Sequence, residues 1–209
     1  MKSGIFLLFI AVLTVLVFAA FETAPPGYGR APISGEQGMF LKNLGIVLQT
    51  WSHYGRTHAQ IIKNLGKPLE QKVEKTPPRS KRDREIRYYT LVYTGLKITT
   101  CDNGYAEFVR DVTLSDKKYD VALKLKIGCS KELVKRVLGP SGSYSFADMG
   151  SKKILFSDAA EIFTNDLEIK SGRRLYYRSD TSSSEFPMTE VNFNFKNDIV
   201  ETIVWLASM

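Results

Sequence analysis

Apolar residues recur with a helical period in two short stretches of the chain, and each stretch is followed by residues that alternate with the period of a strand. The stretch "YGRTHAQIIKNLG" has Thr57 as a helix cap and ends at Gly66. The stretch "IGCSKELVKRVLG" repeats this plan, with Ser130 as the cap and Gly139 at the end. Helices of about two to three turns are marginal alone in water, so each must pack on an apolar layer.

Strands rich in Tyr, Val, Ile and Thr are predicted after each helix and supply that layer. A turn at Asp102-Asn103-Gly104 separates two of them, and a hairpin is predicted around Lys196-Asn197-Asp198. The predicted strands lie within residues 84–101, 104–115, 119–128, 152–156, 173–178 and 189–207.

The two stretches predict a duplicated helix-and-sheet unit. Aligning Thr57 with Ser130 also aligns Ile61 with Val134, Leu65 with Leu138 and Gly66 with Gly139. The second unit needs an insertion that includes residues 145–166 before its pair of tyrosines. We therefore expect an α+β protein built from two tandem units, each with one helix and an antiparallel meander of three to four strands. The expected bounds are 41–127 and 128–209.

The N-terminus predicts export. Lys2 precedes an uncharged run at residues 5–21, which is typical of a signal peptide cleaved after Ala19 or Ala20. The alternative is an uncleaved anchor, because about 17 residues is near the lower limit for spanning a bilayer. We expect residues 1–20 to be this signal peptide or anchor and residues 21–40 to be a flexible linker rich in Pro and Gly. The protein would then be periplasmic, secreted or held at the inner membrane by residues 5–21.

The amino-acid composition limits the kinds of partner and ligand that we expect. The formal net charge of +7 favours contact with anionic surfaces, but the basic residues are too scattered to indicate nucleic acid binding. Cys101 and Cys129 are the two cysteines of the chain, and in an exported protein they predict one disulfide; two buried thiols are the alternative. Two cysteines and two histidines are too few and too far apart to predict a metal site.

The segments "GRTHAQIIKNLGKP", "GCSKELVKRVLGP" and "VNFNFKNDIVETIVW" carry a resemblance to known proteins. Over residues 45–207 the chain resembles the tandem module of β-lactamase-inhibitor-protein-like domains. It is also similar to the single-copy module of small outer-membrane-assembly lipoproteins. The resemblance implies an exported, non-catalytic protein without a cofactor, which binds or inhibits other proteins through an exposed concave sheet face. The chain lacks the lipidated cysteine of the lipoproteins, which counts against their assembly role.

Tyrosines and arginines on the predicted strands are the best candidates for a protein-binding surface in the cell envelope. Adjacent side chains on a strand point to opposite faces, so one ring of each tyrosine pair should face away from the helix. Tyr and Arg often anchor interfaces, although tyrosine also commonly covers half-exposed sheets. We expect the partner to be another protein, for which an acidic patch would suit the basic residues. The alternative is a membrane-anchored envelope scaffold or assembly factor that contacts cell wall or lipid. The candidates are Tyr88, Tyr89, Tyr93, Arg173, Arg174, Tyr176, Tyr177 and Arg178.

Three other features have a functional and a structural interpretation. Residues 72–87 form either a basic docking loop or a solvated hairpin loop. His53 and His58 could be ligands or a general base, but no acidic partner is near in sequence, so exposure beside the first helix is the alternative. The serines of residues 179–187 have no activating base in sequence, so we expect no catalytic residues.

Overall fold

The computed structural model describes residues 35–78, 80, 83–146, 154–179 and 188–207 of the chain. They form helices and one mixed sheet of nine strands, so the expected α+β class is confirmed. The predicted signal peptide or anchor, residues 1–20, lies outside the described residues. Among the residues that are described, no helix is both long enough and apolar enough to cross a membrane.

The first described helix is α2 (Gly35–Gln49). By periodicity alone, the apolar run at residues 39–51 fits either a strand or a helix turn. The first six residues of α2 fall in the expected linker, so the linker prediction is wrong for residues 35–40. Phe40, Leu44, Val47 and Leu48 follow helical spacing and are buried. Glycines at three positions of the helix lower its intrinsic propensity, and burial of this stripe compensates for them. A 3-10 helix, η1 (Thr50–Tyr54), continues from α2.

The two repeated stretches form α3 (His58–Leu65) and α4 (Lys131–Leu138), as predicted. The hydroxyl of Thr57 accepts a hydrogen bond from the Gln60 amide at 3.2 Å, and that of Ser130 accepts one from the Leu133 amide at 3.3 Å. Each helix ends at a glycine with positive φ, as C-terminal caps require.

The strands pair in the order β1-β2-β3-β4-β9-β8-β7-β5-β6. Strands β4 and β9 join the two halves into one continuous sheet, and their contact is antiparallel. Strand β7 runs parallel to β5 because β6 and two short helices intervene in the chain between them. That the halves arose by duplication stays a prediction. The strands are β1 (Glu70–Thr76), β2 (Ile86–Tyr93), β3 (Leu96–Asp102), β4 (Glu107–Leu114), β5 (Gly142–Phe146), β6 (Ile154–Asp158), β7 (Arg174–Ser179), β8 (Met188–Lys196) and β9 (Ile199–Ala207).

The strand predicted at residues 119–128 is wrong. This segment contains a 3-10 turn, η2 (Ala122–Lys124), in which Leu123 and Lys124 have positive φ. Val121 and Leu125 on either side of the turn are buried, so two apolar anchors rather than a strand hold the segment on the core.

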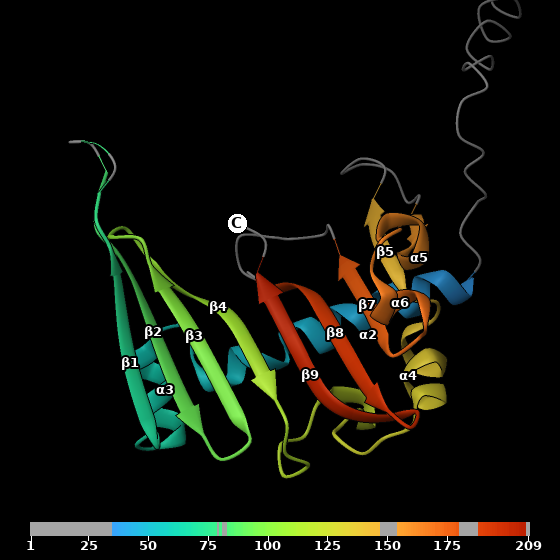
Figure 1. Ribbon diagram of the computed structural model, residues 1–209, viewed down its shortest axis with the longest axis horizontal. Coiled ribbons are helices and arrows are strands. Elements are labelled where there is room, and N and C mark those ends of the chain that lie inside the picture. Colours follow the sequence, from blue (N-terminus) through green and yellow to red (C-terminus); the bar gives the residue numbers. More distant parts are fainter. Residues whose placement is uncertain (1–34, 79, 81–82, 147–153, 180–187, 208–209) are drawn as a thin grey trace, which may run out of the picture. The chain divides into compact units, whose positions relative to one another are not determined.

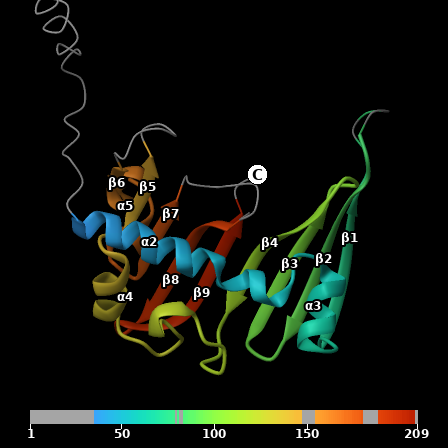
Figure 2. The same ribbon diagram turned by 180° about the vertical axis from the view of Figure 1, so that it is seen from behind.

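Helices α2, α3 and α4 lie on one face of the sheet, as Figure 2 shows. Trp205 of β9 donates a hydrogen bond from Nε1 to the Val47 carbonyl of α2 at 3.3 Å. Asn43 of α2 donates one from Nδ2 to the Val137 carbonyl of α4 at 2.7 Å. The short helices α5 (Ala159–Ile162) and α6 (Leu167–Lys170) lie on the opposite face, beside β5 and β7 (Figure 1).

Two buried tyrosines close the C-terminal end of α4. The Tyr177 hydroxyl donates to the Gly139 carbonyl at 3.1 Å, and the Tyr144 hydroxyl donates to the Pro140 carbonyl at 2.7 Å. Burial raises the pKa of both hydroxyls above the ordinary value of tyrosine. The Tyr144 hydroxyl also lies 3.3 Å from the carbonyl of Leu138, the last residue of α4, which the helix end leaves without an amide partner.

The predicted disulfide is not formed, because Cys101 and Cys129 are both free thiols. Cys129 packs in the core cluster beneath the helices. Cys101 lies opposite Tyr88 and Phe108 in the strand register, and that row faces away from the core cluster. The two buried thiols are therefore on opposite sides of the sheet, and the alternative of unpaired buried cysteines is correct.

Candidate functional site

Over β2, β3 and β4, no helix of the described residues covers the sheet face that is opposite α3, and Figure 1 looks onto that face. We call it the open face. Directly paired residues on neighbouring strands point to the same side of a sheet. Tyr88 of β2, Cys101 of β3 and Phe108 of β4 form one such row. Cys101 is buried beneath this surface, whereas the rings of Tyr88 and Phe108 are partly exposed.

A β-bulge adds a cation to this row. The register of β3 and β4 shifts between Thr99 and Thr100, so Arg110 has no direct partner on β3. A bulge re-aims the side chain of the extra residue. Here the Arg110 guanidinium lies over the Tyr88 ring, 4.8 Å from its centroid. We call Tyr88, Cys101, Phe108 and Arg110 the aromatic–arginine patch.

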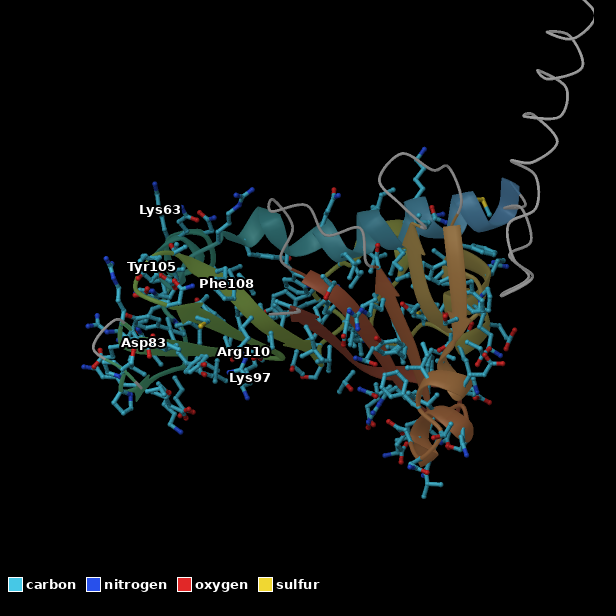
Figure 3. All side chains as sticks on the ribbon, turned by 90° about the horizontal axis from the view of Figure 1, so that it is seen from above. Lys63, Asp83, Lys97, Tyr105, Phe108 and Arg110 are labelled. Atoms are coloured by element: carbon cyan, nitrogen blue, oxygen red, sulfur yellow. The ribbon has the colours of Figure 1, made fainter. Side chains whose placement is uncertain are left out.

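The open face continues on both sides of the patch. Lys97 pairs in register with Val92 and Thr113, and Figure 3 shows Lys97 and Arg110 on one side of the sheet and Lys63 of α3 on the other. Leu206 of β9 lies opposite Asp111 of β4 and is 36% exposed. Apolar and cationic groups therefore share one surface across four strands.

Arg110 differs from the three predicted arginines because it is not held in an ion pair with another described residue. Within the part of the chain that the structure describes, Arg110 is exposed and forms no ion pair. Arg173 pairs with Glu168 at 2.9 Å, Arg174 with Asp166 at 3.0 Å and Arg178 with Glu190 at 3.9 Å.

The first tyrosine pair divides between the two faces, as predicted. Tyr88 lies on the open face, and Tyr89 stacks on the ring of His58 at a centroid distance of 3.8 Å. Tyr93 lies on the helix side, where its hydroxyl donates to the Gly66 carbonyl at 3.2 Å. Tyr88 is thus the one candidate of these three that belongs to the open face.

The second tyrosine pair is not exposed, and the prediction that one of its rings faces solvent is wrong. Tyr177 is fully buried in the core. Tyr176 points to the other face, but Phe163 covers it edge-on with a ring-centroid distance of 4.7 Å. Phe163 follows α5, in the part of the second unit where the duplication hypothesis expects an insertion. Tyr176 therefore belongs to a small second core with Ala159 and Ile169.

The remaining candidates lie apart from the patch. Arg174 and Arg178 are on β7, and strands β9 and β8 stand between β7 and β4, the strand of the patch that is nearest to them. Arg173 is in the turn before β7. The structure therefore does not bring the predicted tyrosines and arginines into one surface.

The basic segment at residues 72–87 begins and ends in strands of the sheet. Its first five residues belong to β1, and its last two begin β2. Lys72 pairs with Glu74 at 2.6 Å, and Arg87 pairs with Glu85 at 2.7 Å. Both interpretations of this segment assumed a loop, and neither predicted strand β1. That the segment docks a partner stays a prediction.

His58 has an acidic partner that sequence proximity could not reveal. Glu107 of β4 accepts hydrogen bonds from the His58 amide at 2.6 Å and from its Nδ1 at 2.9 Å. Thr100 donates to the same carboxylate at 2.5 Å. A carboxylate at the start of a helix also compensates for its unpaired amides. The side chain of His53 lies outside the described ones.

This cluster fits a structural role. A carboxylate that holds Nδ1 leaves Nε2 as the free nitrogen of the ring, which is an arrangement used in acid–base catalysis. Among the described residues, however, no hydroxyl or thiol is hydrogen bonded to Nε2, and no group of three acidic, His or Cys residues could hold a metal. Glu107 therefore ties the start of α3 to β3 and β4.

Comparison with protein-family models and with curated proteins gives no match. A solved structure that matches is an extracellular protein containing an SCP domain from Bacillus anthracis, with 9% identity and a TM-score of 0.43. The alignment covers 90% of this chain and 49% of that chain, so the chain spans about half the length of that protein. A likeness of this degree carries no argument about function.

Cys101, Phe108 and Arg110 were missed from the sequence. Phe108 and Arg110 are two apart in a strand pattern, so a shared face was open to prediction. Their position beside Tyr88 depends on the registers of β2 with β3 and of β3 with β4, and on the bulge, none of which can be predicted from local sequence.

Proposed function

We propose that the chain is an exported, non-catalytic protein of the bacterial cell envelope that binds or inhibits another protein through the aromatic–arginine patch. Arg110 carries the proposal, because it is exposed above the Tyr88 ring and has no ion-pair partner in the described part of the chain. A carboxylate of a partner could pair with the guanidinium without displacing an internal ion pair.

The surroundings of Arg110 support a protein partner. Tyr, Phe and Arg are enriched at the centres of interfaces, where they combine apolar area with hydrogen bonding. Phe108 and Tyr88 offer apolar surface beside the cation, and Leu206 extends that surface across β9. The net charge of +7 favours the approach of an acidic partner. Export rests on the leader-like N-terminal sequence.

The test compares two charge reversals on opposite faces of the sheet. Full-length tagged protein is recovered from the envelope of the producing cell as wild type, Arg110→Glu or Lys63→Glu. We expect an acidic protein to be recovered with the wild type and with Lys63→Glu, and its yield to fall at least about tenfold with Arg110→Glu. Both variants should keep the circular dichroism spectrum of the wild type. Equal recovery with all three proteins would reject the patch as the binding surface.

A further inference from the structure

Strand β1 is an uncovered edge of the sheet. It stands at one end of the strand order and pairs with β2 along one side only (Figure 1). Among the described residues, no strand lies on its other side, and each of its seven residues is exposed. Such an edge presents backbone N–H and C=O groups that can pair with another strand.

The sequence of β1 is complementary to itself when it runs antiparallel. With Val73 opposite Val73 of a second copy, Lys72 lies opposite Glu74 of that copy, and the contact occurs twice across the two-fold axis. Opposite charges in directly facing positions stabilise a strand pair. The same alignment places Gln71 opposite Lys75 and Glu70 opposite Thr76.

Charge also selects this register over its neighbours. A slip of two residues in one direction places Lys72 opposite Lys72 of the second copy, and Glu70 opposite Glu74. A slip of two residues in the other direction places Glu74 opposite Glu74. Both slips bring like charges together, which is destabilising. The pairing centred on Val73 avoids this repulsion.

Charged residues on an edge strand usually prevent pairing. In β1 the two central charges have opposite signs and already form an ion pair along the strand, with Lys72 Nζ 2.6 Å from Glu74 Oε1. Both side chains remain about three-fifths exposed, so a second copy would gain facing partners without burying a lone charge. The charges of β1 therefore disfavour pairing with most strands, but they are complementary to those of β1 in a second copy.

We propose that β1 pairs antiparallel with β1 of a second copy of this chain, centred on Val73. The two sheets then form one continuous sheet, and the two-fold axis perpendicular to it places both open faces on the same side. A dimer would present two aromatic–arginine patches to one target, but the pairing does not depend on what those patches bind.

Cysteine cross-linking tests the geometry. Facing residues of an antiparallel pair have Cα atoms about 4.5–5.5 Å apart, which suits a disulfide. Under mild oxidation, full-length Val73→Cys should form a dimer that survives denaturing electrophoresis without reductant. Gln71→Cys is the matched control, because its two copies would be offset along the strands, and the wild type reports the background of the two buried thiols. Equal cross-linking of both variants, or of neither, would overturn the proposal.

Charge reversal tests the register. In sedimentation velocity, the wild type should dimerise, and Lys72→Glu should dimerise at least about tenfold more weakly because it places like charges opposite each other. The double variant Lys72→Glu/Glu74→Lys restores the complementarity and should restore the dimer. A wild type that stays monomeric at all concentrations, or a double variant as weak as the single one, contradicts the Val73-centred pair.

Discussion

Phe40 of α2 packs directly against Gly139, the glycine that ends α4. A Cβ atom added to Gly139 would lie 2.3 Å from Cδ2 of the Phe40 ring, closer than atoms can approach. Gly66 ends α3 with a similar positive φ, but an added Cβ would meet nothing within 4 Å. The two repeated stretches thus share a backbone turn, and α2 crowds that turn in the second stretch.

We predict different costs for the same substitution at these two glycines. Gly66→Ala should lower the free energy of unfolding by about 1 kcal/mol, because a non-glycine residue is strained at positive φ. Gly139→Ala should lower it by an additional 1–3 kcal/mol, approximately, because Phe40 must also move. Urea denaturation of both variants measures the difference. Equal losses would mean that α2 does not pack on α4 in this way.

The helix ends were predictable because capping is local. Thr57 and Ser130 act within three residues of themselves, so the sequence alone located α3 and α4. Helix α2 was not predictable in the same way. Its three glycines lower its intrinsic helix propensity, and it is stable because Trp205 and Val137, far along the chain, bond to it.

The raised pKa of Tyr177 predicts a loss of stability in alkali. Burial holds its pKa in the folded chain above the value of about 10 that it has when unfolded. Below pH 10 the hydroxyl is protonated in both the folded and the unfolded chain, and the free energy of unfolding has its full value. As pH rises above 10, only the unfolded chain releases the proton, so the free energy of unfolding falls. Tyr177 should therefore contribute a fall of up to about 1.4 kcal/mol per pH unit above pH 10.

Tyr177→Phe isolates this contribution. At pH 8 the variant should be about 1–3 kcal/mol less stable than the wild type, because the Gly139 carbonyl loses its partner. Above pH 10 the gap should narrow, since the variant has no hydroxyl to ionise. Urea denaturation at pH 8, 10 and 11 measures the gap. A constant gap would contradict the burial of the hydroxyl.

The two tyrosine pairs show what strand alternation can and cannot predict. It predicts the face of the sheet to which a side chain points, but not whether another segment covers that side chain. Alternation correctly assigned Tyr88 and Tyr89 to opposite faces. It could not show that Tyr176, which points away from the helices, lies under Phe163. That cover comes from the segment between β6 and β7, which has no strong pattern of its own. Its docking depends on contacts that form only in the folded chain.

The free thiols predict a simple alkylation result. When the protein is unfolded in urea without reductant, iodoacetamide should modify both Cys101 and Cys129. In the folded protein modification should be much slower, because both thiols are buried and burial raises the pKa of each above its usual value. Mass spectrometry counts the adducts. An unfolded chain that takes up iodoacetamide only after reduction would show that a disulfide exists.

Removal of Glu107 should loosen the start of α3. Glu107→Ala leaves the His58 amide and the Thr100 hydroxyl without their shared acceptor, so we expect a loss of about 1–3 kcal/mol in the free energy of unfolding. Glu132→Ala removes an exposed acid from the first turn of α4 and should change stability by no more than about 0.5 kcal/mol. Hydrogen exchange should accelerate in α3 for the first variant alone. Unchanged hydrogen exchange in α3 of Glu107→Ala would show that Glu107 does not hold the start of this helix.

The aromatic–arginine patch is tested most directly by photo-cross-linking in the producing cell. The photoreactive amino acid p-benzoylphenylalanine replaces Phe108, which the strand register places on the open face, or Lys63 on the helix side of the full-length chain. We expect a discrete adduct with another protein from position 108 and none from position 63. No adduct from position 108, the same adducts from both positions, or an adduct that contains only copies of this chain would contradict this expectation.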